Sequence, residues 1–254
     1  MPMLHRPAAK SESSRRTPVR SMPPLALVGA NVEMRLGDTL VTALPEGALW
    51  IADAKTLIVS DVHFEKASAF ALRGQMLPPY DTHAALMKLT DLMLRLQPDI
   101  IVSLGDSFHD GGGPQRMDAR DRDLLKLLMS RCDWIWVEGN HDGRAAETLG
   151  GAVREVLHIG SIVLRHAPTA GAAPGEIAGH LHPCAKVGGR GRSVRRRCFA
   201  TDGVRLVMPA FGAFTGGLNV CDEAYASIFA DGVTALVMGK DRVLPVGHGR
   251  LLAD

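Results

Sequence analysis

The chain has 254 residues, of which 46% are hydrophobic and 22% are charged, and its formal net charge is +2. These values are ordinary for a soluble globular protein and allow one large α/β domain with a buried core. No apolar run approaches the roughly 20 residues that span a bilayer. The small net charge gives no global electrostatic argument for binding nucleic acid.

The first segment, residues 1–24, is rich in Arg, Ser and Pro and contains little to bury. We expect a disordered basic tail there, followed by a single domain over residues 25–254. Arg15 and Arg16 precede a short apolar stretch, but that stretch is too short for an export signal. We therefore predict a protein that does not bind membranes.

The four cysteines contain no C-x-x-C pair. In a chain of this size they are typical of reduced thiols, which predicts a cytoplasmic location. Cys184 follows a histidine by two residues and is a candidate soft ligand, but we interpret it as a small packing residue.

Helices and strands alternate in the first half of the domain. Short apolar runs broken by turns predict strands over residues 25–60. One helix is predicted from Asp81, taken as its N-cap, to the residue before Pro98, and another over residues 118–129. With the apolar runs around them, these helices form a βαβαβ unit, which implies parallel strands. The strands of this unit are predicted over residues 57–60, 100–104 and 134–137.

From residue 153 onward, strands and Gly-rich turns dominate the chain. An α/β half followed by a β-rich half favours an α/β fold in which two packed sheets are flanked by helices.

Polar side chains follow five apolar strands at the point where each strand ends. Loops of an open α/β sheet converge at the carboxyl ends of its strands, so side chains placed there build a site. One such residue is more often part of a polar turn, but five strands in a row make the pattern specific. The side chains able to bind a metal are Asp61, His63, Asp106, Asn140, His166, His180 and His182.

The order of these residues resembles the calcineurin-like metallophosphoesterases, whose pattern is D-x-H, G-D, G-N-H-[DE], H and G-H-x-H. The resemblance covers roughly residues 55–185, and every piece of the pattern is present. Residues 105–110, 179–183 and 209–217 resemble the bacterial ligase-associated DNA damage response endonuclease group. The family resemblance implies a four-layer αββα sandwich with two mixed β-sheets.

The resemblance also implies a role for each site residue. The ligands of one ion would be Asp61, His63 and His182. The ligands of the other would be Asn140, His166 and His180, with Asp106 bridging both ions. His141 would stabilise developing charge or protonate the leaving oxygen, and Asp142 would orient it. Apart from the resemblance, His109 lies three residues after Asp106 and either contacts the substrate or braces its loop.

Asp, His and Asn side chains suit Mn²⁺, Fe²⁺ or Zn²⁺, and so many ligands in one place imply two ions. Two ions about 3.5–4 Å apart clamp a phosphoryl group and hold an attacking metal-bound hydroxide in line. We predict two divalent ions, with Mn²⁺ first and Fe²⁺ or Zn²⁺ as alternatives.

Several arginines crowd residues 190–197, just after the last candidate ligand. Guanidinium groups bind phosphates, whereas arginines that alternate along an exposed hairpin often only face water. Because the segment follows the site directly, we favour phosphate binding. The candidates are Arg195, Arg196 and Arg197.

We predict a two-metal phosphodiesterase, a nuclease that acts on DNA in repair. The resemblance implies a DNA ligase and a helicase as partners. A small-molecule phosphatase or a cyclic-nucleotide phosphodiesterase would use the same ligands. A catalytically silent scaffold would keep the fold, but no position of the motif is degraded. The sequence leaves the oligomeric state open.

Overall fold

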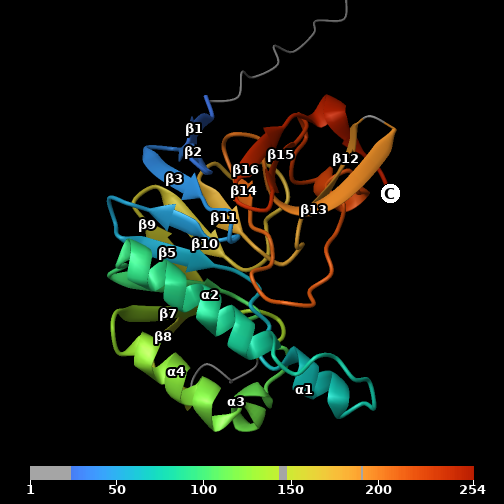
Figure 1. Ribbon diagram of the computed structural model, residues 1–254. Coiled ribbons are helices and arrows are strands. Elements are labelled where there is room, and N and C mark those ends of the chain that lie inside the picture. Colours follow the sequence, from blue (N-terminus) through green and yellow to red (C-terminus); the bar gives the residue numbers. More distant parts are fainter. Residues whose placement is uncertain (1–23, 143–147, 190) are drawn as a thin grey trace, which may run out of the picture.

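Two mixed β-sheets lie face to face, and helices cover the outer side of the first sheet (Figure 1). The structure is a computed structural model that describes residues 24–142, 148–189 and 191–254. The predicted tail, apart from its last residue, and Arg190 lie outside the described residues. None of the described helices is long and apolar enough to cross a membrane.

The first sheet contains eight described strands, which follow one another in sequence order. They are β1 (Ala26–Val28), β2 (Asn31–Leu36), β3 (Thr39–Ala43), β4 (Leu49–Ile51), β5 (Thr56–Val59), β6 (Ile100–Leu104), β7 (Asp133–Val137) and β8 (Ala152–Arg154). Strands β1 to β5 pair antiparallel, and β5 to β8 pair parallel. The predicted βαβαβ unit with parallel strands is therefore confirmed.

Two of the described helices match the predicted ones. They are α2 (Asp81–Leu96) and α4 (Ala119–Met129). α4 begins after Asp118, whose carboxylate accepts a hydrogen bond from the Arg120 N–H at 2.9 Å. The prediction that Asp81 is an N-cap is wrong, because Tyr80 occupies that position. The Asp81 carboxylate instead accepts a hydrogen bond from the Ala67 N–H at 3.0 Å, which ties the start of α2 to the helix before it.

Two short helices were not predicted. They are α1 (Lys66–Ala71) and α3 (Gly113–Arg116). Neither is long enough to show a helical period of apolar residues.

The second sheet is assembled from the β-rich half. Its strands are β9 (Val156–Ile159), β10 (Ile162–Arg165), β11 (Glu176–Ala178), β12 (Cys184–Gly189), β13 (Arg192–Thr201), β14 (Leu206–Val207), β15 (Thr234–Met238), β16 (Val243–Val246) and β17 (Leu251–Leu252). The main path runs β16-β15-β13-β14-β11-β10-β9, and β12 pairs with β13 and β17 at its margin. Strand β11 pairs parallel with β10 and β14, and β12 and β13 form an antiparallel hairpin.

Three clusters of buried apolar side chains define the layers. One cluster fills the space between the sheets and includes Ile58 and Phe199. A second joins the first sheet to α2 and α4, with Leu89 against the face that carries Trp136. The third covers the outer face of the second sheet and includes Tyr225, which lies in the short 3-10 helix η2 (Glu223–Tyr225). The fold is the predicted α/β sandwich with two mixed sheets. The outer face of the second sheet is covered by the third cluster and the short helix η2.

Candidate metal centre

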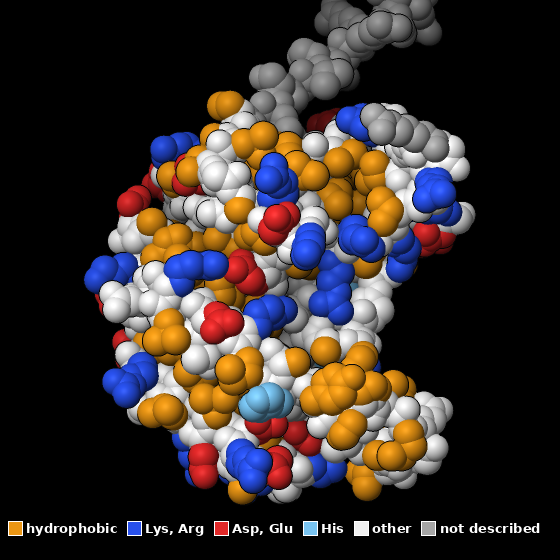
Figure 2. Space-filling model, in the orientation of Figure 1, with side chains coloured by type: hydrophobic (Ala, Val, Ile, Leu, Met, Phe, Trp, Pro, Cys, Tyr) orange, Lys and Arg blue, Asp and Glu red, His pale blue; other side chains and the backbone are white. Residues whose placement is uncertain are grey.

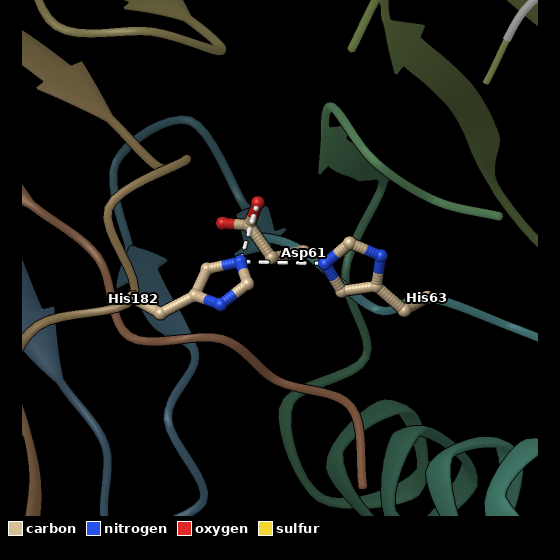
Figure 3. Close-up of side chains that lie close together, drawn as sticks. All are labelled: Asp61, His63 and His182. Carbon is tan, nitrogen blue, oxygen red and sulfur yellow. Dashed lines mark hydrogen bonds and ion pairs between the residues drawn. The ribbon is translucent and has the colours of Figure 1, made fainter. Parts of the chain in front are cut away.

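The loops after β5 and β11 bring the first group of candidate ligands together (Figure 3). His182 Nε2 lies 3.2 Å from Asp61 Oδ1 and 3.3 Å from His63 Nε2. Asp61 is fully buried and His63 nearly so. The three candidate ligand atoms all lie within 4.8 Å of one another. The structure thus brings together the residues that the resemblance assigns to one ion.

His166 lies at the centre of the second group. Its Nε2 lies 2.9 Å from Asn140 Oδ1, 3.1 Å from His180 Nδ1 and 3.4 Å from Asp106 Oδ2. Its Nδ1 donates a hydrogen bond to the Leu104 carbonyl at 3.3 Å. This bond leaves the lone pair of Nε2 facing the other members of the group. Histidines that bind metals commonly hold their second nitrogen in this way.

The two groups adjoin through Asp61. His166 Nδ1 of the second group lies 3.9 Å from Asp61 Oδ1 of the first. Asp61 Oδ2 is held by the Ser60 hydroxyl at 2.6 Å and by the backbone N–H of His180 at 3.0 Å. The same N–H lies 3.3 Å from Oδ1, which is the oxygen that faces His182.

Asp106 is held in the same manner. Its Oδ1 accepts a hydrogen bond from the backbone N–H of His141 at 2.8 Å, and its Oδ2 faces His166. The carboxylate is almost fully buried. Oδ2 is therefore the oxygen that faces the other candidate ligands, while Oδ1 stays bonded to the protein.

The backbone of five candidate ligands lies in the left-handed region. Their φ angles are 51° at Asp61, 49° at His63, 46° at Asp106, 69° at His180 and 46° at His182. Such a conformation costs a non-glycine residue of order 1–3 kcal/mol and persists only where the surrounding contacts determine it. Strained residues of this kind cluster at functional sites. The backbone therefore indicates a site independently of the side chains.

Two motif glycines leave the space that the ligands occupy. A Cβ atom on Gly105, whose φ is 72°, would lie 2.2 Å from His166 Nδ1. A Cβ atom on Gly139 would lie 2.0 Å from the backbone nitrogen of Asp106. No side chain fits at either position unless a candidate ligand moves, which explains why these positions require glycine.

Burial and neighbouring charges set the protonation of the site. Burial lowers the pKa of His63 to about 3, and burial also lowers the pKa of His180. Burial acts to raise the pKa of Asp106, but the hydrogen bond and the charge of His166 outweigh it and bring that pKa to about 2. Near neutral pH these groups are neutral imidazoles and an ionised carboxylate, which are the forms that bind metals.

The pKa of His166 shifts in the opposite direction. Burial acts to lower it, but the hydrogen bond to Asp106 and the charges of Asp61 and Asp106 raise it overall. Both carboxylates therefore favour positive charge at this point of the site.

The two donor sets fit divalent ions. Metal–ligand bonds of roughly 2.0–2.2 Å place neighbouring ligand atoms about 3 Å apart. The separations from His182 Nε2 and from His166 Nε2 to their neighbouring ligand atoms are 2.9–3.4 Å. Imidazole nitrogens mixed with carboxylate and amide oxygens suit Mn²⁺, Fe²⁺ or Zn²⁺.

His141 lies beside the second group, but Asp142 does not orient it. His141 Nε2 is 3.9 Å from Asp106 Oδ2, and its Nδ1 donates to the His109 carbonyl at 3.2 Å. Asp142 instead accepts backbone hydrogen bonds from Phe108 at 2.8 Å and from Gly139 at 3.1 Å. The prediction that Asp142 orients His141 is therefore corrected: Asp142 joins two site loops, and burial raises its pKa to about 6.

The ring of His109 packs on His141. The ring centroids are 5.7 Å apart and the ring planes differ by 16°. His109 also lies edge-on to His63, with centroids 5.9 Å apart. Its Nδ1 is buried without a hydrogen-bond partner in the described part of the chain. His109 thus contacts His141 through both its carbonyl and its ring.

The three candidate arginines are separated by the strand that carries them. Side chains alternate between the two faces of β13, so Arg196 points away from Arg195 and Arg197. Arg195 donates to the Gly217 carbonyl at 2.7 Å and pairs with Asp254 at 3.3 Å. Both Arg195 and Arg196 are exposed.

Arg197 has a structural role. Its Nη1 donates to the carbonyls of Ala210 and Gly212 at 3.0 and 2.8 Å, and its Nη2 donates to Thr215 Oγ1 at 2.7 Å. Arg197, which was predicted to bind substrate, thus makes its hydrogen bonds within the protein. Its guanidinium holds residues 209–217, which we call the 209–217 loop.

Ser60 was missed in the sequence. Its hydroxyl lies 2.6 Å from Asp61 Oδ2 and 3.1 Å from the Leu104 carbonyl. Its position directly before the first candidate ligand was the available signal, because residues next to ligands often orient them.

The fold has two mixed sheets, and two adjoining groups of metal-binding side chains lie in loops that follow its strands. This combination is that of a metal-dependent hydrolase. The model of the calcineurin-like phosphoesterase family matches residues 54–189, and the chain belongs to this family. It is therefore a metal-dependent phosphoesterase.

Two solved structures are similar to this chain, and the first shares its fold. The Pseudomonas putida nuclease MPE is 27% identical, with a TM-score of 0.66, over 85% of this chain and 100% of that one. The phosphoesterase Yfce from E. coli is 14% identical, with a TM-score of 0.41, over 76% of this chain and 98% of that one. No curated protein matches the chain significantly.

Proposed function

We propose that this phosphoesterase is a two-metal nuclease that cleaves phosphodiester bonds in DNA. The observation that carries the proposal is the pair of adjoining ligand groups, 3.9 Å apart between His166 Nδ1 and Asp61 Oδ1. The similarity to the Pseudomonas putida nuclease, which extends over 85% of the chain, supports nucleic acid as the substrate.

The ligand assignment is part of the proposal. The first ion would be held by Asp61, His63 and His182. The second would be held by Asn140, His166 and His180, and Asp106 would contact both. When bound, two such ions stabilise the charge of the phosphoryl group and lower the pKa of a water towards neutrality.

The protein's own contribution centres on His141. Because Nδ1 donates to the His109 carbonyl, the neutral ring carries its proton on Nδ1. Nε2 then bears a proton only in the cationic form of the ring. His141 would therefore act as an imidazolium whose Nε2–H stabilises developing charge or protonates the leaving oxygen. Nε2 lies 3.9 Å from Asp106 Oδ2 and so faces the second ligand group.

The wider context follows the resemblance of the motifs. We extend the proposal to Mn²⁺ as the preferred ion and to a cytoplasmic role in DNA repair beside a ligase and a helicase.

One parallel assay tests the activity. The Mn²⁺-loaded protein is incubated with bis-p-nitrophenyl phosphate, p-nitrophenyl phosphate and single-stranded DNA. We expect hydrolysis of the diester and of DNA to exceed hydrolysis of the monoester. Rapid turnover of the monoester without cleavage of DNA would replace the nuclease with a small-molecule phosphatase.

A further inference from the structure

The 209–217 loop connects two candidate ligands of the same ion. Near its start, the Gly212 N–H donates to the Asp61 carbonyl at 3.3 Å, and just after its end the Leu218 N–H donates to the His182 carbonyl at 3.2 Å. Phe214 follows Gly212 by two residues, so its Cα lies within about 7 Å of that anchor. The loop therefore carries an aromatic side chain to the rim of the metal centre.

Phe214 lies against a second aromatic side chain. The ring centroids of Phe214 and Tyr80 are 6.3 Å apart, and the ring planes differ by 56°. Both side chains remain accessible, at 38% for Phe214 and 59% for Tyr80. Tyr80 directly precedes α2, and Figure 1 shows the orange 209–217 loop descending from the second sheet towards α1 and the start of α2.

The backbone of Phe214 is held in an unfavourable conformation. Its φ is 53°, in the left-handed region that aromatic residues rarely adopt. Arg197 fixes the loop on both sides of Phe214 through Gly212 and Thr215. Lys88 adds a hydrogen bond to the Phe211 carbonyl at 2.7 Å. A costly conformation that is fixed by two half-buried cations, and that leaves a large apolar ring in water, points to a ligand of that ring.

The surroundings fit a polyanion with flat groups. Figure 2 shows this face hollowed between the body of the two sheets, whose edge carries Lys and Arg side chains, and a lobe rich in hydrophobic side chains. Leu72 and Met76, which follow α1, are among the exposed apolar residues of the protein. Cations beside exposed aromatic rings form the usual surface for single-stranded nucleic acid.

We propose that Tyr80 and Phe214 stack a base of single-stranded DNA next to the scissile phosphate. The inference rests on the proposed nuclease function and adds a preference for unpaired strands. In a duplex the bases are stacked on one another and paired, so only a single strand or an opened end offers a free base to the two rings.

The test removes the aromatic rings from the protein and, separately, the bases from the DNA. Binding to the full-length protein is measured by fluorescence anisotropy, with a single-stranded oligonucleotide and with the same strand lacking bases at several central positions. The aromatic variant combines Tyr80→Ala with Phe214→Leu, which keeps a Cβ at position 214. The matched control is Leu94→Ala, because Leu94 is 74% exposed on α2 and lies outside the loop.

We expect the aromatic variant to bind the intact strand about 5- to 150-fold more weakly than the wild type, as for the loss of one stacked base. Removal of the bases should weaken wild-type binding by a similar factor. The aromatic variant should bind the base-free strand no more weakly than the wild type does. Leu94→Ala should bind as the wild type does. Phe214→Trp, which restores a flat ring, should retain binding and show quenching of the new indole fluorescence by DNA.

Three results would overturn the inference. Equal wild-type affinity for the intact and the base-free strand would show that bases are not stacked. If the aromatic variant and the removal of bases weaken binding independently, so that their factors multiply, the bases stack on other residues. If the aromatic variant binds DNA as tightly as the wild type, the two rings serve another partner, such as a protein. If the wild type neither binds nor cuts DNA, the proposed nuclease function itself fails, and that outcome is distinct from the other three.

Discussion

The loops of the metal centre and the β12–β13 hairpin direct their side chains in different ways. In the loops, parallel strands end at one edge, and residues with left-handed backbone turn Asp61 and His182 towards each other. In the hairpin, side chains alternate between faces, so neighbouring arginines separate. The comparison teaches that several suitable side chains close together in sequence form a site only where the backbone makes them converge.

The largest expected effect is at the centre of the converging loops. Asp106→Asn removes the charge that faces His166, so bound metal and phosphodiesterase activity should both fall to background. Elemental analysis and hydrolysis of bis-p-nitrophenyl phosphate measure the two quantities. Asp110→Asn, a carboxylate on the same loop that pairs with Arg116, serves as the control and should keep the metal. Full activity in Asp106→Asn would remove this residue from the metal centre.

The second effect separates chemistry from metal binding within the same loops. His141→Ala should retain the metal and lose roughly 10²- to 10⁴-fold in kcat, the usual contribution of a general acid or base. The loss should be smaller for esters with good leaving groups, which need little protonation. Loss of metal from this variant would instead make His141 a ligand.

The third prediction concerns the hairpin. Arg197→Ala removes charged hydrogen bonds to the 209–217 loop, at a cost of about 1.5–3 kcal/mol. We expect the melting temperature to fall by roughly 3–12 °C for a chain of this size. Arg196→Ala, on the opposite and exposed face, is the matched control and should leave the melting temperature unchanged. Equal shifts in the two variants would contradict the separate roles of the two faces.

The smallest expected effect is the pH dependence of the free energy of unfolding that Lys88 causes. Lys88 is the other cation that holds the 209–217 loop. Burial lowers the pKa of Lys88 to about 8 from 10.5. The unfolded chain then binds more protons than the folded one between pH 8 and pH 10.5, so stability should rise with pH in that window. Relative to Lys88→Met, the unfolding free energy of the wild type should increase by about 1–2 kcal/mol from pH 7.5 to pH 9.5. Urea unfolding measures it, and a flat difference would place the pKa of Lys88 outside this window.

The fold and the candidate ligands could be predicted because they depend on local patterns. Apolar runs that end in Asp61, Asp106 and Asn140 predict both the parallel strands and their common edge. The role of Asp142 could not be predicted, because it depends on which N–H groups of other loops reach its carboxylate. The role of Arg197 was also hidden, because the 209–217 loop meets it only in the folded protein.

The metal content of the wild-type protein tests the central claim most directly. The full-length chain is stripped with a chelator, reconstituted with Mn²⁺, freed of excess ion and measured by elemental analysis against protein concentration. Two adjoining ligand groups predict close to two ions per chain. A value of one, or none, would contradict the two-metal centre from which the proposed nuclease chemistry follows.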